Sequence, residues 1–345
     1  MTLQSDGSVG IVKESTYGTA VVVTRFPEYT DASFTQENEY VQGEGLRVGK
    51  VIARSSRRSL GKVVSSGSFE AELPTKGFGP FWEAALGSGT STLRSGVIYQ
   101  QNYVPLTTDP MPCYTIQTGV PPIGGGTTIA QTFVGSVCDS WELSAEAGGI
   151  AMFKSDWVAK EMLTATAYAT PSYVASPKIF TFTHLSVSIG VNGTDTLTVP
   201  TTTALGTTSK AALTSITKFS VKGENKVDDG GYTAGGAGKR VRRPVYGLRE
   251  IMGSLTAEFI DTTLRDYYLA QSSLHIVATF TSDDPITGGA FATCQVVIPA
   301  CVLEGSVPTS NSGDIIEQDI DFTVLDGESA ASPFYVVHVT ADIAI

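Results

Sequence analysis

Charged residues are scarce in this chain of 345 residues, and basic residues are the scarcer kind. Only 17% of the residues are Asp, Glu, Lys or Arg, and the 34 acidic and 23 basic residues give a formal net charge of −11 at pH 7. Proteins whose main task is to bind nucleic acid need net positive charge or a strongly basic face. The composition therefore argues against that class.

Cysteine and histidine are also few. The four Cys form no CxxC pair and are too sparse for a disulfide framework, so we expect buried free thiols in a protein made in a reducing cytoplasm. The three His fall in strand-like runs away from any candidate nucleophile, and no GxSxG motif occurs. No two Cys or His have metal-ligand spacing. We therefore expect no enzyme activity, no bound metal and no cofactor.

Long apolar runs are missing too. The longest are short, such as residues 276–280, and none approaches the 18 or more residues of a membrane span. The first seven residues lack the charged and apolar regions of a signal peptide. We expect no membrane insertion.

Residues typical of strands and turns are plentiful, with 36 Gly, 16 Pro and 42 Thr. Alternation of polar and apolar residues predicts many strands. Asn192-Gly193 lies between two alternating runs and predicts a hairpin turn. The predicted strands cover residues 66–73, 97–104, 140–146, 181–189, 216–221, 274–281, 294–303 and 317–324.

Two short segments have helical spacing instead. Residues 76–86 place Phe78, Phe81, Trp82 and Leu86 on one face. Residues 261–271 place Leu264, Tyr267, Tyr268 and Leu269 on a similar face, and Asp261 is the expected N-cap. Each helix should lie against a sheet.

These helices reveal an internal repeat. The segment GSFEAEL (67–73) precedes the first helix and GSLTAEF (253–259) precedes the second, and four of the seven positions match. Each copy also has a strand, a Gly-rich loop and a basic cluster before this segment, and a Cys-containing strand followed by an acidic one after the helix. We interpret the chain as two copies of one domain, residues 8–170 and 175–330, with a C-terminal strand or arm at 331–345. The first copy carries an extra Pro/Gly-rich loop, 105–128.

The two basic clusters occupy equivalent long hairpins of the repeat. Three interpretations are open: contact with an acidic protein surface, a solvated loop, and contact with nucleic acid. The net charge argues against the third, and repetition at equivalent places favours an interface. The clusters comprise Arg54, Arg57, Arg58 and Lys62, and then Lys239, Arg240, Arg242 and Arg243.

Acidic residues recur on one face of several predicted strands. Such a face cannot be core unless its carboxylates are paired. It is either an ordinary solvated sheet face or the lining of a polar channel. The residues concerned are Glu72, Glu142, Glu146, Glu258, Glu317, Asp319 and Asp321.

Residues 10–90 contain a distinctive series of short segments. In order they are KESTYGTA (13–20), RFP (25–27), EGLRVG (44–49), RSSRR (54–58), GSFEAELP (67–74) and GFG (77–79). This series resembles the major tail tube proteins of long-tailed, non-contractile bacteriophages. The rest of the chain is similar in the order of its predicted elements more than in its residues. The resemblance implies a structural virion protein of the tail tube, assembled in the host cytoplasm. Its fold would be mainly β, with two tandem β-sandwich or barrel domains, each with one flanking helix and a long hairpin loop.

The resemblance also implies partners. Such domains form rings that stack into a tube, with about four strands from each domain lining the bore and long loops reaching the next ring. The tube houses a tape measure protein, meets terminator and baseplate proteins, and lets double-stranded DNA pass without specific binding. Because one chain carries two copies, we expect a trimeric ring with pseudo-sixfold symmetry; a hexamer with the second copy outside is the alternative.

Simple geometry supports a channel. A barrel of about 24 strands spaced ~4.8 Å apart and tilted by about 40° has a backbone radius of roughly 24 Å. Acidic side chains in the bore would repel DNA and let it slide. We therefore expect some of the seven acidic residues to face the lumen, and the two basic clusters to dock onto the adjacent ring.

Other classes remain open at this stage. A capsid decoration protein or a tail terminator shares the virion setting. A carbohydrate-binding or adhesion module would present Trp and Tyr in an exposed groove, whereas Trp82, Trp141 and Trp157 all have the pattern of core residues.

Overall fold

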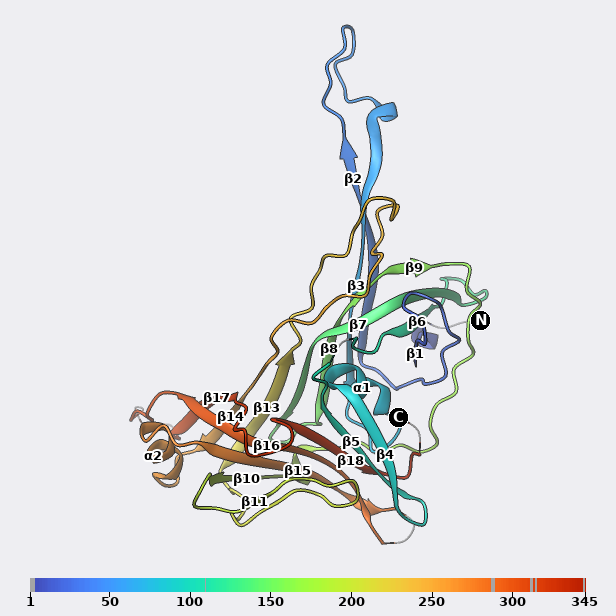
Figure 1. Cartoon of the computed structure of the whole chain (residues 1–345). Coiled ribbons are helices and arrows are strands. Elements are labelled where there is room, and N and C mark those ends of the chain that lie inside the picture. Colours follow the sequence, from blue (N-terminus) through green and yellow to red (C-terminus); the bar gives the residue numbers. More distant parts are fainter. Residues whose placement is uncertain (1–3, 109, 287–288, 311–312, 314, 344) are drawn as a thin grey trace.

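Antiparallel strands build most of this protein, and two short helices lie against them (Figure 1). The computed structural model describes residues 4–108, 110–286, 289–310, 313, 315–343 and 345. Its first half contains η1 (Gln4–Asp6), β1 (Ser8–Lys13), β2 (Asp31–Gln42), η2 (Ser55–Arg57), β3 (Arg58–Glu72), α1 (Gly79–Leu86), β4 (Gly87–Ser95), β5 (Ile98–Pro105), β6 (Tyr114–Val120), β7 (Ile129–Glu146), β8 (Met152–Ala159) and β9 (Glu161–Leu163). Its second half contains η3 (Phe182–His184), β10 (Leu185–Val191), β11 (Leu197–Thr198), β12 (Thr207–Thr208), β13 (Ile216–Glu224), β14 (Glu250–Glu258), α2 (Thr263–Leu269), β15 (Leu274–Pro285), β16 (Phe291–Gly305), β17 (Glu317–Val324) and β18 (Tyr335–Thr340).

Strand pairing follows the same order in both halves. In the first half β1 pairs with β6, β6 with β7, β7 with β8, β8 with β3, and β3 with β2. In the second half β10 pairs with β15, β15 with β16, β16 with β17, β17 with β14, and β14 with β13. The last strands also correspond, since β9 pairs with β7 and β18 with β16. The two halves therefore share one order of strand pairing, and the duplication stays a prediction.

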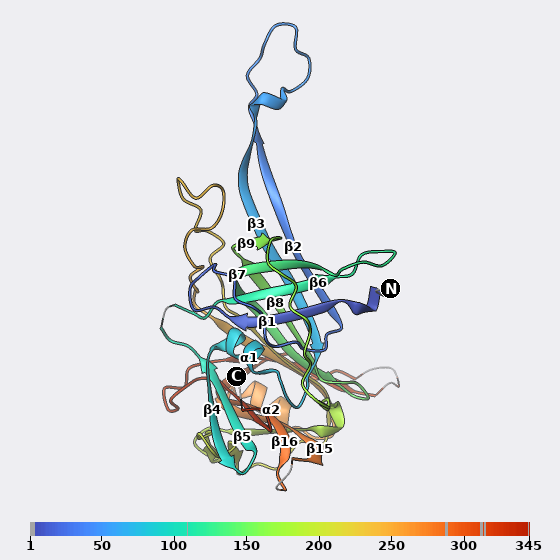
Figure 2. The ribbon, with the colours of Figure 1, turned by 90° about the vertical axis from the view of Figure 1, so that its right-hand side faces the viewer.

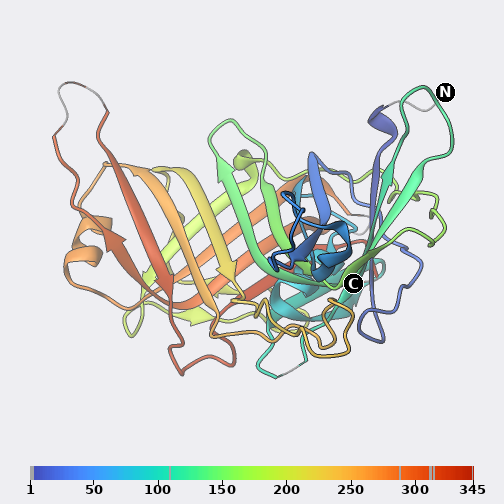
Figure 3. The same ribbon diagram turned by 90° about the horizontal axis from the view of Figure 1, so that it is seen from above.

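The two halves join into one continuous layer. The C-terminal part of β7 pairs with β13, which places eight strands side by side in the order β2-β3-β8-β7-β13-β14-β17-β16. Figure 3 shows the green and blue strands of the first half beside the yellow and orange strands of the second. The long strands β7 and β16 also extend beyond this layer, where they pair with β6 and β15. Each half is therefore a two-layered unit in which one long strand belongs to both layers.

One large hydrophobic core cluster runs through both halves, and a small second one consists of Val277, Val297 and Tyr335. The large cluster extends from Val9 in β1 to Val336 in β18. Trp82, Trp141 and Trp157 are at most 2% exposed, which confirms that the tryptophans are core residues. The four Cys are also buried with free thiols.

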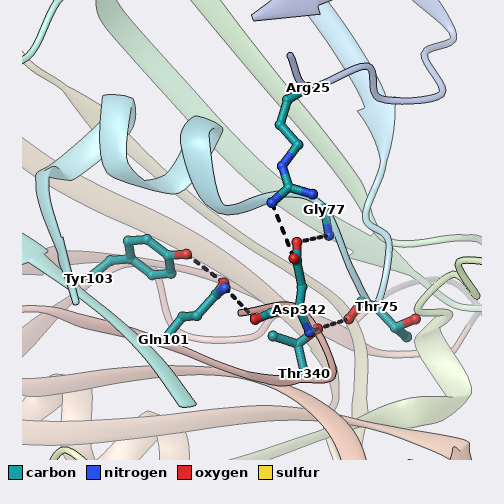
Figure 4. A network of polar contacts seen from close by, with 7 residues as sticks. All are labelled: Arg25, Thr75, Gly77, Gln101, Tyr103, Thr340 and Asp342. Atoms are coloured by element: carbon teal, nitrogen blue, oxygen red, sulfur yellow. Dashed lines mark hydrogen bonds and ion pairs between the residues drawn. The ribbon is translucent and has the colours of Figure 1, made fainter. Parts of the chain in front are cut away.

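The C-terminus fastens the second half to the first (Figure 4). β18 pairs with β5, and beyond it Arg25 forms an ion pair of 3.1 Å with the carboxylate of Asp342. That carboxylate also accepts a hydrogen bond from the Gly77 N–H, and the Thr340 hydroxyl donates to the Thr75 carbonyl over 2.8 Å. Residues 335–340 therefore form a paired strand inside the sheet.

Both predicted helices are confirmed, but two details of the second were wrong. Thr262 is the N-cap of α2, and the Asp261 carboxylate instead accepts a hydrogen bond from the Thr263 N–H. Leu269 is 61% exposed, and Leu264 is the buried residue of this helix.

Two predicted strand features were also wrong. The segment 181–189 begins as the helical turn η3, because Thr181 and His184 form a reciprocal capping box. The turn at Asn192-Gly193 is present, with Gly193 at a φ of 84°, yet it does not join two paired strands. β10 pairs with β15, and β11 pairs with β12.

The predicted extra loop 105–128 contains a buried strand, β6, the equivalent of β15. Its alternation is hidden because polar residues are buried and hydrogen-bonded there: Gln117 donates to the Thr132 hydroxyl, and the Thr115 hydroxyl donates to Glu14. The element of the first half without an equivalent in the second is the β4–β5 hairpin.

Candidate interaction surfaces

One face of the eight-stranded layer is polar across its width. Alternate residues of each strand point away from the core, as in β8, where Phe153, Ser155 and Trp157 are buried while Lys154 and Asp156 are exposed. All seven acidic residues predicted to form a common face lie on this side. Glu72 and Glu142 are half-buried; the exposed ones are Glu146, Glu258, Glu317, Asp319 and Asp321.

Further acidic residues share this face and were missed in the sequence. Applying the same alternation to the neighbouring strands identifies Asp31, Glu70, Asp156, Glu224, Glu250 and Glu304. Three lysines oppose them, Lys154, Lys218 and Lys222. Lys154 forms an ion pair of 3.4 Å with Glu70. Carboxylates outnumber ammonium groups on this surface, so it is acidic overall.

The layer ends in two open edges. In the described part of the chain, β2 pairs with β3 alone, and residues 302–305 of β16 pair with β17 alone. In the repeat, β2 corresponds to β13 and β16 to β7. Those counterparts pair with each other inside the chain, along the seam from Lys218–Glu146 to Glu224–Ser140. Each open edge therefore lacks the kind of partner that its counterpart has.

The two helices also differ in how far they are buried within the chain. Every residue of α1 except Glu83 is buried, and the first-half carbonyls at its C-terminus accept hydrogen bonds from second-half side chains. Asn225 donates to the Ala85 carbonyl over 3.0 Å, and Arg249 donates to the Leu86 carbonyl over 2.9 Å. The equivalent helix α2 buries only Leu264. It contacts β16, whose C-terminal part is an open edge.

The first basic cluster lies on an arm that stands away from the body. We define the arm as residues 37–64, the part of the β2–β3 hairpin beyond the pairing of β3 with β8, and its tip as residues 43–57 (Figures 1 and 2). Arg57 and Arg58 are exposed, with the Arg58 guanidinium 4.5 Å from the Tyr40 ring centre. Lys62 lies 4.7 Å from the ring centre of Tyr232 in the second half.

The second basic cluster is engaged within the chain. Its loop, residues 225–249, folds onto the base of the arm, where the Val63 N–H donates to the Gly238 carbonyl over 2.8 Å. Lys239 forms an ion pair of 2.5 Å with Glu161, and Arg240 is 3% exposed. Arg242 forms an ion pair with Asp228, and its hydrogen bond lowers the pKa of that carboxyl. Arg243 donates to the Met111 carbonyl.

Two of the histidines have local polar partners. The His275 ring contacts Asn192 and Thr208, and His184 pairs with Asp283. No group of three His, Cys, Asp or Glu residues is arranged to hold a metal ion among the described residues. Across those same residues, no helix is long and apolar enough to cross a membrane.

A family model described as "Phage tail tube protein" matches residues 4–324. No curated protein matches the chain.

Proposed function

Because the chain belongs to the phage tail tube protein family, we propose that three copies close into a ring of 24 strands, and that rings stack into the tail tube. The protein is a non-enzymatic structural component of the virion tail. One observation carries the ring proposal: the internal seam between β7 and β13 has a vacant counterpart at each end of the layer. Pairing β2 of one chain with β16 of the next would repeat that seam and satisfy both edges.

The repeat specifies the register of the proposed seam on the β2 side. Thr35 of β2 pairs with the residue that precedes Gly67, the first residue of the repeated segment. Lys222 of β13 pairs with the residue that precedes Gly253, its counterpart. Thr35 therefore corresponds to Lys222.

The register of the proposed seam on the β16 side is derived in the same way. Asp156 of β8 pairs with the residue two positions before Glu142. Asp321, its counterpart in β17, pairs with the residue two positions before Ser306. Because Glu142 pairs with Lys222 inside the chain, Thr35 should lie opposite Ser306 of the neighbouring chain.

Cross-linking tests both the ring and its size. We expect the double variant Thr35→Cys/Ser306→Cys, oxidised in concentrated protein, to give a ladder that ends at three chains on a non-reducing gel. The internal pair Lys222–Glu142 lies three residues from Asn225, whose N–H donates to the Asp139 carbonyl, so it is a non-hydrogen-bonded pair. Opposite Cα atoms in such pairs are about 4.5 Å apart, which a disulfide can span.

Two matched controls define the result. Lys222→Cys/Glu142→Cys should form an internal disulfide with no ladder. Thr35→Cys/Val307→Cys shifts the register by one residue, turns the second thiol to the other face, and should not cross-link. A ladder that continues to six chains would favour the hexamer, and failure of the Thr35–Ser306 pair where the internal pair succeeds would contradict the seam.

The acidic face is proposed to line the bore. It is the uncovered face of the layer, and a low density of positive charge there would leave passing DNA unbound. The tape measure protein would fill the same bore before DNA, and terminator and baseplate proteins would close the two ends. Assembly is proposed to occur in the host cytoplasm of a phage with a long, non-contractile tail.

Reversing charge on β17 tests the position of this face. Glu317→Lys/Asp319→Lys/Asp321→Lys changes the charge per chain by +6, from −11 to −5. We expect assembled tubes of the variant to retain at least ~10-fold more short linear duplex than wild-type tubes, with the difference lost at high salt. Closed circular DNA is the control because it cannot thread a tube. Equal gains for linear and circular DNA would place these residues outside.

A further inference from the structure

The arm tip exposes apolar side chains that nothing in its own chain covers. Leu46, Val48 and Val51 are almost fully exposed, and Ile52, the least exposed of the four, still exposes 81% of its surface. Large apolar groups clustered at this level of exposure mark interaction sites in soluble proteins. The tip is also basic: residues 43–57 contain four cations, Arg47, Lys50, Arg54 and Arg57, and one carboxylate, Glu44.

A groove with matching chemistry lies at the foot of the same hairpin. It has a volume of about 220 Å³, and its apolar wall includes Phe26, Tyr29, Tyr173, Val174 and Ile179. The Phe26 and Tyr173 rings meet edge to face with centres 6.4 Å apart, and Tyr173 remains 46% exposed. Two carboxylates, those of Glu28 and Glu72, also line the groove, so its charge complements the basic tip.

The cation in the groove lining is held by a local hydrogen bond. Lys76 lies in the lining, and its ammonium group donates a hydrogen bond of 2.9 Å to the Ala175 carbonyl. An acidic and aromatic groove of this kind suits apolar and arginine side chains, which pack on aromatic faces.

Tip and groove lie at opposite ends of one hairpin. The groove surrounds the start of β2 and the end of β3, where Asp31 pairs with Glu70. The tip begins past the other end, where Gln42 pairs with Arg58. The twelve residues of β2 span about 40 Å at ~3.3 Å per residue, so a tip cannot fold back into its own groove.

We propose that the tip of one chain docks into the foot groove of a second copy in the adjacent ring. Two complementary surfaces at opposite ends of one molecule make a head-to-tail contact that does not close on itself, and such contacts propagate as filaments. The apolar tip residues pack on the aromatic wall of the groove, and Arg47 and Lys50 approach Glu28 and Glu72. This inference rests on the proposed tube function and adds the acceptor surface for the arm.

Mixing two single variants tests the contact directly. Ile52→Cys and Tyr173→Cys place one thiol each at the tip and in the groove. We expect a disulfide-linked pair of chains when the two proteins are mixed and oxidised, and at least ten times less product from either protein alone. Ile52→Cys mixed with Leu269→Cys, whose thiol lies on exposed α2, is the matched control and should give no more than background.

The outcomes separate stacking from ring closure. Equal cross-linking to the Tyr173 and Leu269 positions, or none to either, would overturn the docking proposal. The Thr35–Ser306 ladder reports the ring independently, so rings without tip-to-groove product would remove this inference alone. If the tip instead inserts into lipid, wild-type protein should sediment with anionic phosphatidylserine–phosphatidylcholine vesicles, and Leu46→Ser/Val48→Ser/Val51→Ser/Ile52→Ser should not. That result without cross-linking would also overturn the proposal.

Discussion

Replacing Phe153 with Ala should lower the free energy of unfolding by about 3–5 kcal/mol, because a large buried ring would leave a cavity in a tightly packed aromatic cluster. The Phe153 side chain is fully buried in β8. Its ring centre lies 5.0 Å from those of both Phe78 and Trp82, in edge-to-face geometry. These contacts hold α1 against the eight-stranded layer.

Urea denaturation followed by Trp fluorescence measures this change, since all three Trp are buried in the same core cluster. Leu269→Ala is the control, because its side chain is mostly exposed on α2 and should shift stability by no more than ~0.5 kcal/mol. Phe153→Leu keeps much of the volume and should fall between the two. A loss below ~1 kcal/mol for Phe153→Ala would show that the cluster collapses to fill the gap.

The second large effect is a loss of stability in acid through His338. Its ring is buried in β18, opposite Gln101 of β5 and Cys294 of β16. Burial lowers the pKa of His338 to about 4 from 6.5, and the Thr75 backbone acts in the opposite direction. Between pH 6.5 and pH 4 the unfolded chain therefore binds a proton at His338, whereas the folded chain does not. The free energy of unfolding falls as the pH drops through this range.

The expected size is about 3 kcal/mol lost through this group between pH 7 and pH 4. His338→Leu removes the titration, so the difference in unfolding free energy between variant and wild type should change by that amount across this range. Burial also lowers the pKa of His275, which both proteins retain, so its contribution cancels in the comparison. Parallel pH profiles for the two proteins would show that His338 does not titrate as a buried base.

Local sequence patterns identified the β class, both helices and the tryptophan core. These patterns missed strands that form only because a neighbouring strand or a distant residue supplies their hydrogen bonds. β4 reads GSGTSTLRS, with no apolar alternation, and it forms because β5 supplies its hydrogen bonds. β6 was hidden by buried polar residues such as Gln117, whose side chain is satisfied only by residues distant in the chain.

The candidate surfaces divide in the same way. Strand parity placed the seven acidic residues on one face, because side-chain direction in a strand follows from sequence position alone. The burial of the second basic cluster could not be predicted from strand alternation. Arg240 is buried because its loop folds back onto the first half, and no local pattern encodes that contact. The foot groove likewise joins segments around Phe26, Glu72 and Tyr173 that only the fold brings together.

The loop 225–249 that folds onto the base of the arm has a consequence for helical symmetry. The two halves are alike in strand order, yet only one of them extends a free arm. A ring of three chains would then be sixfold in its barrel and threefold in its connectors. Turning one ring by 60° on the next would align every strand and misplace every arm. The tube would therefore be a three-start helix. The arms would determine the rotation from one ring to the next, because the barrel strands alone would accept two rotations that differ by 60°.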